Sequence, residues 1–304
     1  MSNSVQTSVA AIIPTYNREN TIIKCVESVL AQTLSVDEIF IIDDCSTDHT
    51  IDRLRSFRKK ISILQTDKQS GAQKARNVGI RAAKSNWIAF LDSDDEWLPN
   101  KIEKQFSALK TVNFNPNTVI HGDSFRIKSN STKKKYWQPI IIDGNNSYRQ
   151  LLTNSGTLFP SLLTSKSALK NIGYLDEKIE AYQEWDTAIR LAKFCRFIHI
   201  QEPLFIYRTH EQTISKDSDK SIDGYQYVVN KHKQEIIYNC GVNVFNSHLY
   251  INAKLAMNSN QFDYAINILN SITPKNVKVK ILLFLCKLRI KPLHFTKMRR
   301  FYHE

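Results

Sequence analysis

Several features are scarce in this 304-residue chain, and each shortage excludes a class of protein. Eight glycines and eight prolines are few for this length, which argues against long disordered linkers. The five cysteines are scattered without a CxxC pair, so the sequence predicts neither a zinc site nor a disulfide framework and favours a reducing compartment. The longest uninterrupted apolar run near the C-terminus, Ile281 to Cys286, is far too short to span a bilayer.

Several sequence signatures are also missing. The first eight residues are mostly polar, so we expect no signal peptide and a cytoplasmic protein. No GxGxxG follows the first apolar run and no Walker A sequence occurs, which leaves a Rossmann dinucleotide site or a P-loop unsupported. No RRM, zinc-finger or homeodomain signature is present, so we expect no nucleic-acid partner.

Positive charge, in contrast, is abundant. The formal net charge is +13, which predicts anionic partners such as nucleotide phosphates or an anionic membrane face. The segment 274–304 carries nine Lys or Arg and one acid. Within it, residues 280–291 mix large apolar and basic side chains. This segment favours either of two interpretations: a helix on the anionic inner face of the cytoplasmic membrane, or a helical cap with solvated lysines.

The first hundred residues alternate apolar runs with amphipathic stretches. The runs 9–13, 38–42 and 88–91 are typical of strands buried on both faces of a parallel sheet, and 61–64 is expected to be a short strand of the same sheet. The stretches between them have helical spacing, and one of them begins after Gly71 with small side chains on one face. Strand, helix, strand, helix with crossovers of this length predicts an α/β fold, a parallel sheet with helices on both faces.

Beyond residue 101 the pattern loosens. It predicts strands over 118–123, 198–200 and 204–207 and a helix over 187–194. After a Ser/Asp/Lys-rich stretch that ends at Lys220, the pattern is helical from Ile222 onward. We therefore expect a main domain over 1–215, with halves 1–100 and 101–215, and a C-terminal helical region over 216–304.

A cluster of acids follows the run 88–91. Asp92 and Asp94 are two residues apart, so in an extended backbone they point to the same side. Two converging carboxylates at a strand end can hold a hard divalent cation. The alternative is that these acids form a solvated turn, with Asp95 and Glu96 only starting the next helix.

Five segments together carry a specific resemblance. In order along residues 8–212, the chain resembles the family 2 glycosyltransferases, which have the GT-A fold and invert the anomeric configuration. The segments that carry the resemblance are Ile12-Ile13-Pro14-Thr15-Tyr16-Asn17, Ile41-Ile42-Asp43-Asp44-Cys45-Ser46-Thr47-Asp48, Gly71 with Ala75-Arg76-Asn77-Val78-Gly79, Asp92-Ser93-Asp94-Asp95 and Gln183-Glu184-Trp185-Asp186.

The resemblance implies a nucleotide-sugar site in the first half. Thr15 and Tyr16 correspond to uridine contacts, with Tyr16 stacked on the base and Pro14 beside them. Asp44 corresponds to the carboxylate that accepts from uracil N3–H, which suits an ionised Asp because it is an acceptor only. Arg76 corresponds to a contact with the nucleotide or its phosphates.

The resemblance also implies a metal and a base. Asp94 and Asp92 correspond to ligands of Mn²⁺ or Mg²⁺ held with the donor diphosphate, and Asp92 and Ser93 also to nucleotide-sugar contacts. His210 lies in a Tyr-Arg-x-His segment that flanks the site in many relatives. Glu184 stands where the family places its catalytic base, more often an Asp, so the longer side chain leaves the fine geometry open.

The implied activity is metal-dependent transfer of a hexose or N-acetylhexosamine from a UDP-sugar to a hydroxyl of a glycan or lipid-linked acceptor. Surface polysaccharide, lipooligosaccharide and capsule synthesis are the expected settings. Two alternatives use the same nucleotide-binding half. One is a nucleotidyltransferase, which would release pyrophosphate, and the other is a non-catalytic nucleotide-sugar-binding protein.

Overall fold

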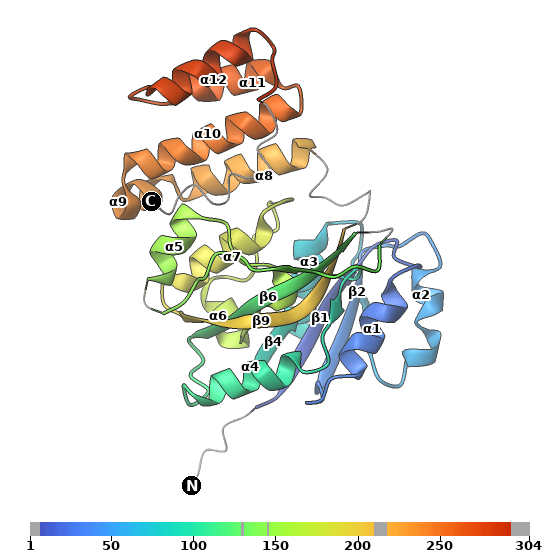
Figure 1. The fold of residues 1–304 in the computed structure, drawn as a ribbon. Coiled ribbons are helices and arrows are strands. Elements are labelled where there is room, and N and C mark those ends of the chain that lie inside the picture. The colour runs from blue at the N-terminus through green and yellow to red at the C-terminus, as the bar shows by residue number, and fades with distance from the viewer. Residues whose placement is uncertain (1–6, 129–130, 145, 210–217, 293–304) are drawn as a thin grey trace. The chain divides into compact units, whose positions relative to one another are not determined.

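A computed structural model of the chain describes residues 7–128, 131–144, 146–209 and 218–292. Its contacts divide the chain into two compact units, residues 1–211 and 212–304. The first unit contains the sheet, and the second contains helices (Figure 1). None of the helices within the described ranges combines the length and apolar content that crossing a bilayer requires.

The first unit is built on one sheet with strand order β3-β2-β1-β4-β8-β6-β9-β5, and β7 pairs with β6. Figure 1 shows these strands flanked by the helices of the unit. The strands are β1 (Val9–Thr15), β2 (Glu38–Asp43), β3 (Ser62–Gln65), β4 (Trp87–Phe90), β5 (Glu96–Trp97), β6 (Thr118–Lys128), β7 (Lys135–Trp137), β8 (Leu163–Ser165) and β9 (Arg196–Thr209).

Parallel pairing joins β3, β2, β1 and β4, which confirms the fold class expected from the alternation of strands and helices. One difference lies in β1, which continues through Pro14 to Thr15. Pro14 is paired in register with Ile42, one residue before the strand ends. A proline is tolerated there although it cannot donate a ladder hydrogen bond.

Helices cover both faces of this sheet. The helices of the first unit are α1 (Ile22–Leu30), α2 (Thr50–Arg53), α3 (Ala72–Ala82), α4 (Lys101–Lys110), α5 (Ser147–Thr153), α6 (Lys166–Asn171) and α7 (Gln183–Ala192). Ile13 belongs to the core formed with α1 and α4, whereas its neighbour Ile12 meets Gly79 of α3. Alternate strand residues point to opposite faces, so α3 lies across the sheet from α1 and α4.

The close approach of α3 depends on Gly79. A Cβ added at this residue would lie 2.6 Å from Ile42 Cδ1 and 2.9 Å from Ile12 Cγ2, too close for any real side chain. Small residues on this helix therefore let it lie directly on β1 and β2, as the sequence predicts. This seating places the first turns of α3 near the carboxyl ends of the strands.

The second half of the sheet differs from the prediction at β9. The two strands expected at 198–200 and 204–207 are a single strand, β9. Its register against β6 is interrupted, because Ile200 lies opposite Gly122 whereas Phe205 lies opposite Ser124. The polar interval between two apolar runs therefore marks an irregularity within one strand, and a bulge of this kind is not visible in the hydropathy pattern.

The second unit is helical, as the pattern after Ile222 indicates. It consists of α8 (Ser218–Lys231), α9 (Lys233–Cys240), α10 (Val242–Asn258), α11 (Phe262–Ser271) and α12 (Val277–Lys287). Helix α10 packs against α8, α9 and α11, and α12 packs against α11.

Candidate functional site

The candidate site lies where β1, β2 and β4 end. Thr15 at the end of β1 pairs with Asp43 at the end of β2, and Ile12 pairs with Phe90 at the end of β4. The residues that follow these three strands therefore share one edge of the sheet. In open α/β sheets this carboxyl edge is where ligands bind.

Asp44 is a buried acceptor at this edge. Its carboxylate accepts from the Thr66 hydroxyl at 2.7 Å, from the Ser70 amide at 2.9 Å and from the Gly71 amide at 2.7 Å. Gly71 has φ +88°, a conformation that suits glycine and lets these consecutive amides face the carboxylate. A carboxylate offers about four lone-pair sites, so Asp44 can accept from one further donor while holding the loop before α3.

The predicted uridine contacts lie beside Asp44. Pro14 and Thr15 are buried, and Tyr16 is half-buried. The Thr15 carbonyl accepts from the Asp44 amide at 2.8 Å, which fixes the two strand ends together. Arg18, which the sequence argument missed, donates to the Tyr16 carbonyl at 3.2 Å and lies 3.6 Å from the Asp94 carboxylate.

Arg76 connects three parts of the site. Its Nη2 donates to Asp92 at 2.6 Å, and its Nη1 donates to Gln73 at 2.8 Å and to Gln183 at 3.0 Å. Its guanidinium carbon lies 4.2 Å above the ring of Phe159. Although predicted only as a nucleotide contact, this buried arginine joins the acidic turn after β4 to the first turn of α7.

Glu184 lies in that first turn of α7. The helix begins at Gln183, four residues before the predicted start, with Tyr182 at φ +60° as the residue before it. The side chain is half-buried, and burial raises the pKa of the Glu184 carboxyl to about 7. The negative charge of Asp92 also raises this pKa, whereas the Glu184 backbone amide and the charge of Arg76 lower it.

A carboxyl with a pKa near 7 can take up a proton at neutral pH. This is the property that general acid–base catalysis requires. Burial outweighs the helix N-terminus here, which would otherwise favour the ionised form. The neighbouring acid Asp186 has a different environment: it is buried and forms an ion pair with Arg190 at 2.8 Å.

The acidic turn divides into two parts with different partners. Asp92 pairs with Arg76, and the Ser93 carbonyl accepts from the Thr21 hydroxyl at 2.9 Å. Asp95 is buried and accepts from the Arg208 amide at 2.9 Å; burial, followed by the charges of Asp94 and Asp92, raises its pKa.

The interpretation of Asp95 and Glu96 as the start of a helix is wrong. Glu96 lies in β5 and pairs with Arg208 at 2.6 Å, whereas α4 begins only at Lys101. The sheet edge captures these two acids because β9 runs alongside them and offers an amide and a guanidinium. The two acids therefore fasten the end of β9.

The same turn offers part of a metal site. Asp92 and Asp94 carry the hard carboxylate oxygens that Mg²⁺ and Mn²⁺ prefer, and both side chains are partly exposed. Within the described residues no group of three or more His, Cys, Asp or Glu side chains could hold a metal ion. These residues fit a cation that takes its other ligands from a bound diphosphate and water. His210 lies outside the described residues.

A chain of polar side chains runs from the buried part of β6 toward the surface. Asp123 accepts from the Tyr136 hydroxyl and lies 2.7 Å from His199 Nε2. The rings of His199 and His121 lie 4.3 Å apart, and His121 Nε2 lies 2.8 Å from the Ile142 carbonyl. His121 and Asp123 are fully buried, whereas Tyr136 is 48% exposed. Tyr136 lies in β7, a strand missed because it is short and surrounded by lysines.

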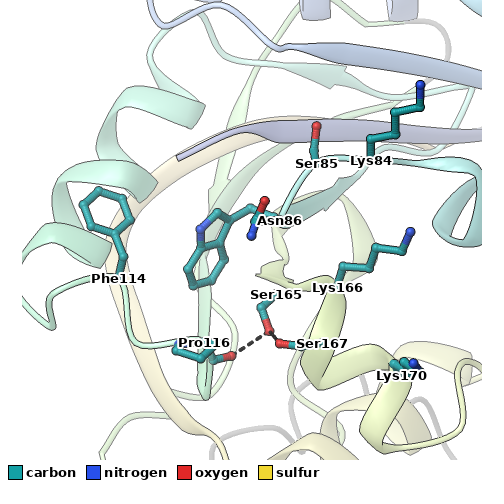
Figure 2. Close-up of a pocket in the computed structure, with 10 residues that line it drawn as sticks. Lys84, Ser85, Asn86, Phe114, Pro116, Ser165, Lys166, Ser167 and Lys170 are labelled. Carbon is teal, nitrogen blue, oxygen red and sulfur yellow. Dashed lines mark hydrogen bonds between the residues drawn. The ribbon is translucent and has the colours of Figure 1, made fainter. Parts of the chain in front are cut away.

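One pocket lies at the start of β4, whereas the acidic turn of the candidate site follows the end of that strand. It has a volume of about 430 Å³ (Figure 2). Its lining includes Trp87, at the start of β4, and three lysines. Lys166 donates to the Ala83 carbonyl, and the Ser165 hydroxyl lies 2.7 Å from the Pro116 carbonyl. Because these groups bond to the protein and none of the predicted site residues lines the pocket, it is separate from the candidate site.

Comparison with known proteins places these features among glycosyltransferases. A family described as "Glycosyl transferase family 2" matches residues 10–173. An uncharacterized glycosyltransferase of Haemophilus influenzae is 29% identical over 222 residues, 71% of this chain and 74% of that protein. A protein of Escherichia coli named UDP-Glc:alpha-D-GlcNAc-diphosphoundecaprenol beta-1,3-glucosyltransferase WfgD is 31% identical over 219 residues, 70% of this chain and 82% of that protein.

Solved structures share the fold. A crystal structure of S. aureus TarS in complex with UDP-GlcNAc superposes with a TM-score of 0.65 at 17% identity, covering 93% of this chain and 88% of that one. A complex of the same protein with UDP gives a TM-score of 0.64. The likeness confirms the GT-A fold expected from the sequence.

Because Arg76 makes these contacts, we expect that removing its charge lowers the stability of the folded protein. Arg76→Met keeps an unbranched side chain over Phe159 but loses the hydrogen bonds to Asp92, Gln73 and Gln183. We expect the free energy of unfolding to fall by about 2 kcal/mol, measured by urea denaturation. Arg81→Met is the matched control, since Arg81 lies on the same helix over the ring of Tyr174. Equal stabilities of the two variants would contradict the connecting role of Arg76.

Proposed function

The chain belongs to glycosyl transferase family 2, and we propose that it is an inverting transferase that uses a UDP-sugar. The sugar, a hexose or N-acetylhexosamine, moves to a hydroxyl of a glycan or lipid-linked acceptor in surface polysaccharide, lipooligosaccharide or capsule synthesis. The observation that carries the proposal is the Glu184 carboxyl, with its pKa raised to about 7, linked through Gln183 and Arg76 to the acidic turn.

Glu184 is the proposed base. The acceptor hydroxyl gives its proton to the Glu184 carboxylate as its oxygen forms the bond to the anomeric carbon. The bond from that carbon to the diphosphate oxygen breaks, and UDP leaves with the electron pair. Attack and departure on opposite faces of the sugar invert the anomeric centre in a single displacement, so no covalent enzyme intermediate is needed.

The edge formed by β1 and β2 is the proposed uridine site. Tyr16 is half-buried and offers a ring for stacking on the base, flanked by Pro14 and Thr15. Asp44 has capacity for one further donor, which uracil N3–H supplies. On this proposal residues 1–100 bind the nucleotide sugar and residues 101–215 bind the acceptor.

The diphosphate lies, in this proposal, between Arg76, Ser93 and the two carboxylates Asp92 and Asp94. Asp92 and Asp94 would hold Mn²⁺ or Mg²⁺, with His210 as a proposed third protein contact. The cation would neutralise charge on the leaving diphosphate. Arg76 orients Asp92 through their 2.6 Å contact, so the arginine positions the carboxylate even before a nucleotide binds.

We place the enzyme in the cytoplasm, in peripheral contact with the anionic inner face of the membrane. Two features support this proposal. Relatives named WfgD and WfaP act, by name, on a diphosphoundecaprenol-linked sugar, and an acceptor of that kind is anchored in lipid. The net charge of +13 also favours an anionic surface.

Replacing the base tests the catalytic assignment. Glu184→Gln keeps the size of the side chain but cannot accept the proton, so we expect transfer to fall by at least about 100-fold while UDP affinity is retained. Release of UDP from UDP-glucose and UDP-GlcNAc, in the presence of diphosphoundecaprenol-linked GlcNAc, measures turnover, and calorimetry measures binding. The control is Glu180→Gln, an exposed residue just before α7. Unchanged turnover in Glu184→Gln would refute the assignment, and pyrophosphate release in place of UDP would favour a nucleotidyltransferase.

The raised pKa predicts a pH dependence. Because the base works in its ionised form, the transfer rate should be constant well above pH 7 and fall about tenfold per unit below the pKa of about 7. Initial rates between pH 5.5 and 8.5 at saturating donor measure this profile. A rate that stays flat down to pH 5.5 would show that Glu184 is not the titrating group.

The metal assignment predicts that UDP binding depends on both the cation and Asp94. Calorimetric titration of the wild-type chain with UDP should give a tighter complex with Mn²⁺ than with EDTA. Asp94→Asn should lose most of this difference, because an amide oxygen is a weaker ligand than a carboxylate. Asp67→Asn, distant in sequence from the acidic turn, is the control. Identical wild-type affinity with and without Mn²⁺ would count against the site.

A further inference from the structure

Helix α12 has two apolar faces, and among the described residues only one of them packs against the rest of the unit. Val279, Leu282 and Cys286 are buried, where α12 packs against α11. Cys286 also donates to the Phe262 carbonyl of α11 at 3.2 Å. Through this buried face, α12 packs onto the rest of the second unit as its last described helix (Figure 1).

The other apolar face is open. Val277 is 70% exposed, Ile281 55%, Phe284 62% and Leu288 53%. Their spacing of four, three and four residues keeps them on one stripe, since successive helical residues are about 100° apart. The buried residues Val279, Leu282 and Cys286 fall on the opposite side by the same geometry. Four large apolar side chains in one row form a contiguous surface and are not scattered exposed residues.

Positive charge borders this stripe. Lys278, Lys280 and Lys287 are exposed, and they lie on both sides of the row of apolar side chains. Residues 275–292 contain six Lys or Arg and no Asp or Glu. The basic side chains beside the stripe therefore have no acidic neighbours in the same segment. Arg289 lies 3.4 Å from Asp263, which belongs to α11.

An apolar stripe flanked by lysines fits one kind of partner better than others. A bilayer surface offers hydrocarbon to the stripe and, when it contains anionic lipids, phosphate oxygens to the lysines. A helix of this length, about 16 Å, cannot cross the hydrocarbon core but can lie along its boundary. A second copy of this chain would bring the same cluster of lysines against this one, which like-charge repulsion opposes.

We propose that the exposed stripe formed by Val277, Ile281 and Phe284 of α12 and by Leu288, which directly follows the helix, binds the surface of anionic membranes. The four side chains insert among the acyl chains near the headgroups. Lys278, Lys280 and Lys287 pair with lipid phosphates, so binding weakens as the salt concentration rises. The proposal identifies the surface responsible for the membrane contact proposed above. It can be tested without sugar transfer, so its failure and the failure of the transferase proposal are distinguishable.

Vesicle flotation with the full chain is the direct test. We expect the wild type to float with vesicles of phosphatidylglycerol and phosphatidylcholine but not with phosphatidylcholine alone. Ile281→Ser/Phe284→Ser should lower the partition coefficient at least about tenfold. The triple variant Lys278→Gln/Lys280→Gln/Lys287→Gln should lower it to a similar extent and remove the salt dependence.

The matched control is Tyr238→Ser, which removes an aromatic side chain that is 90% exposed on α9 of the same unit. Its partition should equal that of the wild type. All substituted side chains are exposed, so circular dichroism and UDP binding should be unchanged in every variant. A wild type that fails to float with anionic vesicles overturns the proposal, as does equal flotation of Ile281→Ser/Phe284→Ser.

Sedimentation analysis tests whether a second copy of this chain covers the stripe instead of a membrane. A wild type that is dimeric in solution, does not bind vesicles and becomes monomeric on Ile281→Ser/Phe284→Ser would show that the stripe joins two copies. That result would also overturn the proposal. A monomeric wild type that floats with anionic vesicles supports it.

Discussion

The guanidinium of Arg76 is the interaction on which the rest of the candidate site depends. It is buried, and it faces three elements that are far apart in sequence: the turn after β4, the start of α7 and the aromatic ring of Phe159. A buried charge requires partners, so those elements must converge for the arginine to be accommodated. The approach of α3 to the sheet at Gly79 puts the arginine within reach of all of them.

The acids of the turn after β4 also need charged or hydrogen-bonding partners. Asp92, Asp94, Asp95 and Glu96 are close in sequence, and their mutual repulsion would oppose a compact turn. Each has a separate partner in the fold: Arg76 for Asp92, Arg18 for Asp94, and the amide and guanidinium of Arg208 for Asp95 and Glu96. Three arginines from three segments thus keep the turn folded, and the side chains of Asp92 and Asp94 stay partly exposed beside Arg76 and Arg18.

The sequence predicted the parallel half of the sheet because short apolar runs alternate there with amphipathic stretches, and it predicted that Asp44 and Asp92 follow strand ends. It did not predict β7 or the continuity of β9, since a short exposed strand and a bulge leave no periodic signal. Arg18, Gln73 and Gln183 were missed for a related reason. Their importance comes from contacts made at long sequence separation, whereas a single sequence reports mainly local preference.

The pairing of Asp95 with Arg208 has a consequence for how the protein is made. These residues are 113 positions apart, and β5 pairs only with β9, so the acidic turn reaches its final form late in synthesis. A ribosome that has released only the first hundred residues has supplied β1 to β5 without β8, which pairs with β4, and without β9, which pairs with β5. We therefore expect the acidic turn to reach its native contacts only after β9 has been synthesised, since contacts at long sequence separation form late.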